Sequence, residues 1–379
     1  ENYRILGNFF AKFNFFDDKL QIQANYNADL SFTYDYTYYN ENHPYGTGVG
    51  RLVEAYRHVP NTTFEVYANY NDKFGDVDFS AMLGHSYQDV TRKQNYVDVR
   101  GFPSPSFNIV NAAAEFYNVT GTLNEYAMES YFGRITAGYK DRYMLTATLR
   151  TDGSSKFAPE NRWGWFPSVS FGWNLGNEPF MEDLKFRASY GRTGNQEGIS
   201  PWAYHAKMSG GKNYGGQSGI AVSDFGNRNL RWEKADQYDV GFDLAFLKGK
   251  VNMIFDIYQK NTFDLLYNKP VAAHTGTTST LSNIGSIRNR GVEFTLNTHF
   301  NFGKHFSWLS QFNISHNKNI IKSLTGEDII GSNRILRAGE EVGSWYVFEQ
   351  LGIYQYDGEV PDPQYADGIR AGDVKWRDV

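Results

Sequence analysis

Apolar and polar residues alternate one by one in many short stretches of this chain. In one such stretch, Leu20, Ile22, Ala24 and Tyr26 alternate with Lys19, Gln21, Gln23 and Asn25. Because successive side chains of a β-strand point to opposite faces, this pattern predicts strands with one apolar and one polar face. Similar patterns lie at 143–150, 184–190, 239–246 and 292–297. A helix does not explain them, because charged residues would then fall within its apolar stripe.

The connections between the predicted strands alternate strictly between short and long. Short turns are predicted at 16–18, 140–142, 247–250 and 301–305, and long connections at about 37–62, 90–126, 152–164, 193–232, 263–287 and 318–344. Tight turns on one side and long loops on the other are typical of outer-membrane barrels. The pattern predicts about thirteen strands, each near the roughly 9 to 11 residues that a tilted strand needs to cross a bilayer.

Aromatic residues make up 17% of the 379 residues, while mean hydropathy is only -0.55. A membrane barrel reconciles the two values, because only every second strand residue meets lipid and aromatic girdles mark the membrane interfaces. No apolar run approaches the roughly 18 residues of a membrane helix, which excludes helical spanning. The chain has no cysteine and a mild net charge of -5. No thiolate zinc site and no nucleic-acid partner are therefore expected.

The two ends of the chain suggest a longer polypeptide. Glu1 is followed by strand-like sequence, without the basic and apolar regions of a signal peptide that an exported protein needs. An odd number of strands does not close a bacterial single-chain barrel, and residues 373–379 are interpreted as a polar loop. The sequence therefore predicts an all-β fold, an antiparallel transmembrane β-barrel in which residues 1–379 form one incomplete domain.

No pattern of catalytic or cofactor-binding residues emerges. The eight histidines are scattered and lack the H-E-x-x-H spacing of a zinc site. Gly216-Gln217-Ser218-Gly219 lacks the glycine spacing and strand-to-helix setting of a nucleophile elbow. The glycine-rich stretch 46–50 is not followed by a helix that could hold a phosphate. No enzymatic activity, metal or cofactor is therefore expected.

Several sequence blocks from residue 142 onward carry a family resemblance. They are 142–157, which ends in Asp152-Gly153-Ser154-Ser155-Lys156-Phe157; Trp165-Phe166-Pro167-Ser168 with Gly172-Trp173; 184–191 with Gly194-Asn195; 229–233 with Gln237, Gly241 and Asp243; and Asn283, Gly285, Asn289, Gly291 and Glu293. In this order they resemble the SusC-like (SusC/RagA) family of TonB-dependent transporters, the nutrient importers of Bacteroidetes-type outer membranes. Residues 1–141 match by barrel pattern more than by motif.

This resemblance implies a plugged barrel of about 22 strands. It also implies import of glycans or oligopeptides, energy delivered by TonB, a SusD-like surface lipoprotein as a lid, and no cofactor. The family's plug domain, TonB-contacting segment and last strands have no counterpart in the sequence. The chain is therefore expected to supply a central piece of the barrel, embedded in outer-membrane lipid.

Charged residues on polar strand faces are candidate lumen or plug contacts: Arg150, Arg187, Asp239, Asp243, Asp256 and Glu293. An Arg or Lys facing lipid at mid-depth would cost roughly 2 to 4 kcal/mol. One interpretation is that these residues solvate a water-filled, plugged lumen. A sharper hypothesis is that Arg150 and Arg187 pair with plug carboxylates. Gly172, Gly191 and Gly241 also lie within predicted strands, where they suit bends or a close approach of the plug.

Aromatic residues gather in the predicted external loops: Tyr34, Tyr36, Tyr38, Tyr39, Tyr45, Trp202, Tyr204, Tyr214, Trp345 and Tyr346. Rings near strand ends are expected to form a girdle at the lipid headgroups. Trp202, Tyr204 and Tyr214 lie deeper in a long loop and are candidate substrate or partner contacts, because aromatic faces stack on other rings. The alternative function is a soluble or surface-exposed all-β glycan-binding protein, whose sandwich or propeller strands would also alternate.

Overall fold

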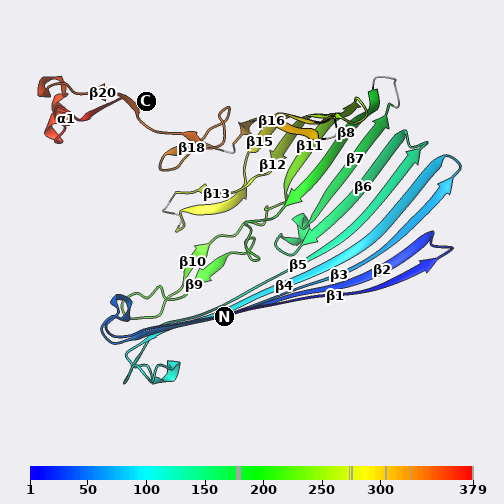
Figure 1. The fold of residues 1–379 in the computed structure, drawn as a ribbon. Helices are drawn as coiled ribbons and strands as arrows, with labels where there is room; N and C mark the ends of the chain where they lie inside the picture. Colours follow the sequence, from blue (N-terminus) through cyan, green and yellow to red (C-terminus); the bar gives the residue numbers. More distant parts are fainter. Residues whose placement is uncertain (176–180, 273, 275, 304, 325, 378–379) are drawn as a thin grey trace.

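The protein forms one large sheet of twelve strands (Figure 1). The computed structural model describes residues 1–175, 181–272, 274, 276–303, 305–324 and 326–377. The strands of the sheet are β1 (Asn2–Phe15), β2 (Leu20–Tyr39), β3 (Arg51–Phe74), β4 (Val77–Arg100), β5 (Glu115–Tyr139), β6 (Tyr143–Ser154), β7 (Trp163–Asn174), β8 (Met181–Asn195), β11 (Glu233–Phe246), β12 (Val251–Phe263), β15 (Ser286–Phe302) and β16 (Phe306–Ser323). Each strand pairs antiparallel with the next one in this order, so the sheet is a succession of hairpins.

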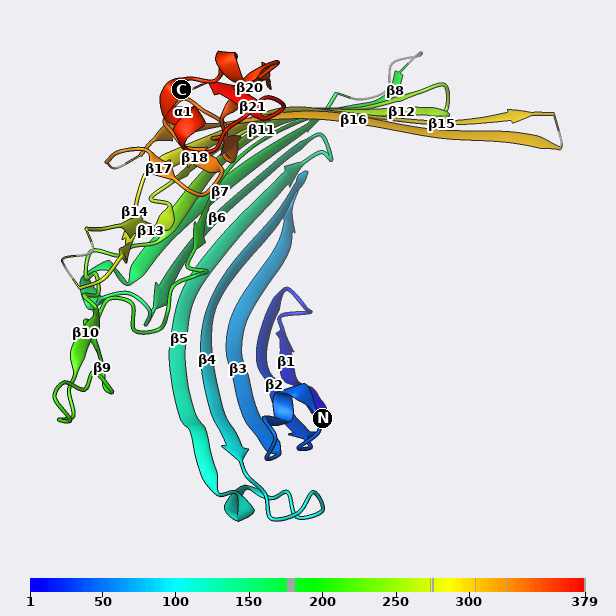
Figure 2. The same ribbon diagram turned by 90° about the vertical axis from the view of Figure 1, so that its left-hand side faces the viewer.

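The sheet is a curved, open wall. β1 and β16 form its two edges and do not pair with each other. Figure 2 shows the strands turning steadily from β1 to β16, so that the wall bends around one side. This curvature follows from the right-handed twist of each strand, which accumulates across a large sheet. The predicted all-β, antiparallel and incomplete barrel is confirmed.

The long connections, and the segment that follows β16, carry small elements at one end of the wall (Figure 1). They are the strand pairs β9 (Lys207–Ser209) with β10 (Ala221–Asp224), β13 (Leu266–Pro270) with β14 (Ser279–Asn283), and β20 (Glu349–Ile353) with β21 (Val374–Arg377); the three short strands β17 (Ile329–Ile330), β18 (Arg334–Leu336) and β19 (Ser344–Trp345); the helix α1 (Asp362–Ala366); and the 3₁₀-helices η1 (Pro44–Gly46), η2 (Val110–Ala112), η3 (Pro159–Asn161) and η5 (Asp357–Glu359). Within the described part of the chain, no helix has the length and apolar character to cross a membrane.

One of these small elements, β21, contradicts a prediction from the sequence. The residues 373–379 were expected to form a polar loop, but Val374–Arg377 form β21 and pair with β20. The partner strand lies more than twenty residues earlier in the chain. Local alternation carries no information about such a distant pairing, which explains the error. Residues 378 and 379 lie outside the described residues.

Short turns join the strands at the opposite end of the wall. Lys140 and Asp141 have φ angles of 53° and 52°, and Lys248 and Gly249 have 61° and 69°. Positive φ at both central residues suits the twist of the flanking strands, although side chains other than those of Gly, Asn and Asp rarely adopt it. The predicted turns at 16–18, 140–142 and 247–250 are confirmed. β15 and β16 are also joined by a short connection, of which residue 304 lies outside the described residues.

The strands β2 to β5 are longer than the sequence indicated. They contain 20, 24, 24 and 25 residues. At about 3.3 Å per residue, 24 residues extend about 79 Å, which exceeds what a strand tilted at about 45° needs to cross an apolar band of about 25 Å. Where such strands continue into water, both faces can be polar and the alternation is lost. Therefore the loops predicted at 37–62 and 90–126 shrink to 40–50 and 101–114. The large sheet has twelve strands where about thirteen were predicted, because the segment after β16 forms only short strands outside this sheet.

Because the strands are longer, several tyrosines that were assigned to a loop belong to a strand. Tyr34, Tyr36, Tyr38 and Tyr39 lie within β2 and not in a loop. Tyr34 stacks on Tyr56 of β3, with ring centroids 4.6 Å apart. Such cross-strand aromatic pairs stabilise an antiparallel ladder. Tyr38 and Tyr39, and the Tyr56 partner of Tyr34, thus belong to strands within the segment 37–62 that was predicted as a loop.

The register of strand pairing produces one apolar face across the wall. Phe186, Phe242, Phe255, Phe294 and Ile314 lie directly opposite one another on five successive strands. Their face is not covered: Leu145 and Phe242 keep 48% and 38% of their surface exposed. In the described part of the chain, the other sheets have only two or three strands each, too few to bury a face of this width. A wide exposed apolar face of this kind is expected of a membrane barrel and not of a soluble sandwich.

Substitutions at two consecutive residues of β12 test which face of the wall meets lipid and which meets water. Phe255 lies on the apolar face, and Ile254 on the opposite face beside Asp243. In the full-length protein folded in lipid vesicles, Phe255→Arg should lower the free energy of unfolding by about 2 to 4 kcal/mol, because the charge meets hydrocarbon. Ile254→Arg is the matched control and should change it by less than about 1 kcal/mol. Urea titration measures both values, and equal losses would contradict the assignment of faces.

Candidate functional site

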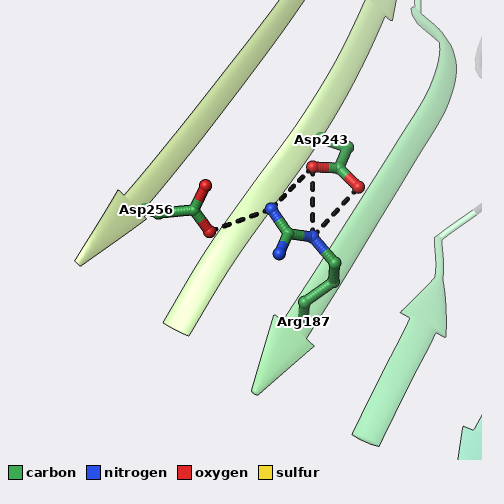
Figure 3. A network of polar contacts seen from close by, with 3 residues as sticks. All are labelled: Arg187, Asp243 and Asp256. Atoms are coloured by element: carbon green, nitrogen blue, oxygen red, sulfur yellow. Dashed lines mark hydrogen bonds and ion pairs between the residues drawn. The ribbon is translucent and has the colours of Figure 1, made fainter. Parts of the chain in front are cut away.

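The strand register places a charged cluster on the face of the wall opposite to the apolar one, and Figure 3 shows its three residues, Arg187, Asp243 and Asp256. Arg187 of β8 donates from Nε to both carboxylate oxygens of Asp243 of β11, at 3.1 and 3.0 Å. Its Nη2 atom donates to Asp243 Oδ1 and to Asp256 Oδ1 of β12, each at 2.9 Å. One guanidinium therefore links three neighbouring strands. Charge-assisted hydrogen bonds of this kind are stronger than neutral ones, so the cluster braces the wall at this point.

A glycine makes this link possible. Gly241 lies between Arg187 and Asp256 in the register of the three strands. A Cβ atom on Gly241 would overlap Asp256 Oδ1 and lie 2.8 Å from Arg187 Nη2. The guanidinium can therefore cross β11 only because residue 241 has no side chain. The sequence indicated a bend or a plug contact at this position, and it did not indicate the passage of a side chain.

The same arrangement recurs two strands further along. Tyr258 of β12 lies across Gly291 of β15, where any Cβ atom would overlap the tyrosine ring. Its hydroxyl donates to Asn317 Oδ1 of β16 at 3.2 Å. Arg187 and Tyr258 thus each cross a glycine of the neighbouring strand and bond to the next strand but one.

All six charged candidates share this polar face. Asp239 lies opposite Ser189 and Tyr258, and Glu293 lies opposite Asp256. Among the described residues, neither Asp239 nor Glu293 has a cation within 4.0 Å. The face therefore carries carboxylates without an ion-pair partner around the Arg187 cluster. That this polar face lies in the lumen of a closed barrel, or against a plug, stays a prediction.

Arg150 belongs to a second polar cluster on the same face. Its Nε donates to Asp152 Oδ1 at 2.7 Å, and its Nη2 donates to Ser130 Oγ of β5 at 2.9 Å. Arg150 and Arg187 thus both have partners in the wall itself, and their pairing with plug carboxylates stays a prediction. In the part of the chain that the structure describes, no group of three or more His, Asp or Glu residues is arranged to hold a metal ion.

The aromatic loop candidates lie between β8 and β11. The rings of Trp202 and Tyr204 both contact His205, with centroids 6.2 and 4.0 Å away. Tyr214 lies at the end of a tight turn, where its backbone pairs with Gln217 in both directions, and 91% of its surface is exposed. Trp202 and Tyr204 are therefore neighbours, and Tyr214 extends separately into solvent. Their contact with a substrate or partner stays a prediction.

A small buried core holds the long connections together. Its side chains are Phe157, Phe166, Ile199, Ala203, Leu230 and Trp232. The Trp232 ring lies 5.2 Å from that of Phe157 and 5.5 Å from that of Phe166. Its Nε1 donates to the carbonyl oxygen of Arg162 at 2.9 Å. Sequence reasoning missed this core, although large apolar residues isolated in polar loops were a signal that could have revealed it.

One sequence block that carries the family resemblance packs into this core. In the block 152–157, Ser154 and Phe157 are fully buried, and Lys156 is only 7% exposed. Burial lowers the pKa of the Lys156 ammonium, which lies 4.3 Å from the centroid of the Tyr126 ring. These contacts make the block a packed connection at the wall's rim. It is structural and does not present an open binding loop.

Comparison with known proteins identifies the family. A family described as "TonB dependent receptor-like, beta-barrel" matches residues 2–376. The chain belongs to this family of TonB-dependent transporters of the outer membrane. It is 34% identical to the TonB-dependent receptor P3 of Formosa agariphila, over 96% of this chain and 38% of that protein. It is 31% identical to the TonB-dependent receptor SusC of Bacteroides thetaiotaomicron, over 81% of this chain and 33% of that protein.

Solved structures show the same wall. The RagAB peptide importer in its closed-closed state matches with a TM-score of 0.88 and 24% identity, over 100% of this chain and 43% of that chain. At this identity the likeness concerns the fold alone. The SusC-like resemblance is confirmed, and the chain spans well under half the length of the relatives that it matches.

The link over Gly241 can be tested directly. Gly241→Ala in the full-length protein should separate Arg187 from Asp256 and lower the free energy of unfolding by about 1.5 to 3 kcal/mol, the usual range for hydrogen bonds to charged groups. Gly191→Ala on the neighbouring strand is the control, because its Cβ atom would meet only Ser168 Cβ at an ordinary 3.6 Å. Urea titration in lipid vesicles measures both variants. If Gly241→Ala were no less stable than Gly191→Ala, the passage would have no structural role.

Proposed function

We propose that this chain forms part of the barrel wall of a TonB-dependent importer that takes up glycans or oligopeptides. The complete transporter would add a plug, energy delivered through TonB, and a SusD-like surface lipoprotein as its lid. The proposal rests chiefly on the continuous apolar face that the strand register builds across the wall, backed by a polar, charged face. Membership in the transporter family supports a role in transport and not in catalysis.

The two faces suit two different surroundings. The rows of Phe and aliphatic residues would contact lipid, where an unpaired charge is costly. The opposite face would line a hydrated lumen, where Asp239 and Glu293 remain solvated or meet donors of a plug. Because Arg187 is already bound by Asp243 and Asp256, a plug carboxylate would have to share this guanidinium with the wall.

The alternative function, a soluble or surface-exposed glycan-binding protein, has less support. A soluble sandwich or propeller buries one face of each sheet in a dry core. Here Leu145, Phe242 and Ile257 are exposed on one continuous face. The buried core instead lies among the long connections. A binding module would therefore leave most of its apolar surface in water.

The cargo has two candidate classes. One structural neighbour is named a peptide importer, and one sequence relative is SusC. The loop candidates Trp202, Tyr204 and Tyr214 could stack on sugar rings or on peptide side chains. Oligopeptides and glycans are therefore both proposed as cargo, and the same residues would serve either.

Uptake by living cells tests the proposal. A strain that lacks the full-length gene should fail to deplete either an oligopeptide mixture or an oligosaccharide mixture from its medium, and the restored gene should recover that depletion. Removing TonB from the restored strain should abolish uptake, because the import is energised. Mass spectrometry of the medium identifies the depleted class. Uptake that persists at full rate without TonB would instead indicate passive diffusion and contradict the proposal.

A further inference from the structure

Basic side chains cluster on the apolar face of the wall. We define the basic patch as Arg288 and Arg290 of β15 with His316 and Lys318 of β16. Arg290 lies directly opposite Lys318, and His316 lies opposite Val292. Val292 belongs to the same cross-strand row as Ile257 and Val240. The patch therefore adjoins the apolar rows and lies on the face opposite to the Arg187 cluster.

The basic patch lacks acidic partners. Arg290 donates a hydrogen bond to the neutral side chain of Gln259. No carboxylate lies within 4.0 Å of the patch among the described residues. The nearby Asp236 is held by both Nε and Nη2 of Arg192, at 2.6 and 2.8 Å. Positive charge on this part of the face is therefore uncompensated by the wall.

A groove runs beside the patch. It has a volume of about 650 Å³, and its walls include Tyr238, Val240, Ile257, Val292, Arg290 and Lys318. Val240, Ile257 and Val292 are 41%, 50% and 42% exposed, so the apolar part of the groove is open. One end of the groove is thus aliphatic and the other is cationic. This combination matches an amphiphile with an apolar chain and an anionic head.

The position of the groove along the strands indicates that it lies at the membrane interface. Tyr190 and Tyr238 lie in the same cross-strand row as Gln259 and Arg290, with their rings 5.0 Å apart. Tyrosine at this level of a barrel marks the interface between hydrocarbon and headgroups. The row lies toward the long connections, which face outward in barrels of this kind. The patch therefore lies at the headgroups of the outer leaflet.

We propose that this groove binds an anionic, phosphate-bearing lipid of the outer leaflet. Its acyl chain would lie on Val240, Ile257 and Val292, and its phosphate would meet Arg290 and Lys318. Arginine and lysine near a membrane surface attract anionic headgroups, and Arg can bind phosphate through two parallel hydrogen bonds. The site depends only on the position of the wall in the outer membrane and not on the cargo. Its failure would therefore leave the proposed import function untouched.

Native mass spectrometry of the full-length protein in mild detergent tests the site. The probes are phosphatidylglycerol, phosphatidylcholine with the same acyl chains, and inorganic phosphate. The wild type should bind phosphatidylglycerol in preference to phosphatidylcholine. The double variant Arg290→Gln with Lys318→Gln should weaken phosphatidylglycerol binding about fivefold for each charge removed. The matched control is Arg134→Gln with Lys260→Gln, which removes the same charge from the opposite face.

The outcomes separate the possibilities. Loss of the anionic preference in the patch variant, with the preference kept in the control, would support the lipid site. Equal losses in both double variants, or no preference in the wild type, would overturn it. Inorganic phosphate that bound as tightly as phosphatidylglycerol would overturn the assignment to a lipid and indicate a free anion. Retained heat-modifiable mobility on gels shows that each variant is folded.

Discussion

The register between neighbouring strands decides what each face of this wall can contact. Side chains alternate with a period of two, so a slip of one residue would exchange the two faces of a strand. From β8 to β15 the register keeps Phe186, Phe242, Phe255 and Phe294 in one row. Hydrocarbon on one side and water on the other penalise any slip, because charges such as Asp243 would then enter lipid. The same constraint places the basic patch and the Arg187 cluster on opposite faces.

The polar face adds ties that reach across more than one pair of strands. Arg187 crosses Gly241 to reach Asp256, and Tyr258 crosses Gly291 to reach Asn317. Backbone hydrogen bonds join only neighbouring strands, whereas these side chains join a strand to the next but one. The side chains of Arg187 and Tyr258 also lie along the wall, across Gly241 and Gly291. If this face lined a lumen that holds a plug, as proposed, these ties would stiffen the wall without narrowing the lumen.

The sequence predicted those features of the fold that depend on local alternation. The strands around Leu145, Phe242 and Phe294, the short turns at Lys140-Asp141 and Leu247-Lys248, and the common face of the six charged residues all follow from the period of two. About half of each of β3, β4 and β5, and the last residues of β2, were missed because strands that continue into water need no alternation. β21 was missed because its partner is distant in the chain. Gly241 and the loop core around Trp232 depend on contacts between separate segments, which a pattern along one strand does not reveal.

The most direct test of the account compares two adjacent positions of β11. The chain contains no cysteine, so Phe242→Cys and Asp243→Cys each introduce a single labelling site in this part of the full-length protein. A fluorophore at each site, in vesicles containing brominated lipid, reports contact with hydrocarbon. The account predicts strong quenching at position 242 and little at position 243. Equal quenching at both positions, or stronger quenching at 243, would contradict a wall with one face in lipid and the other in water.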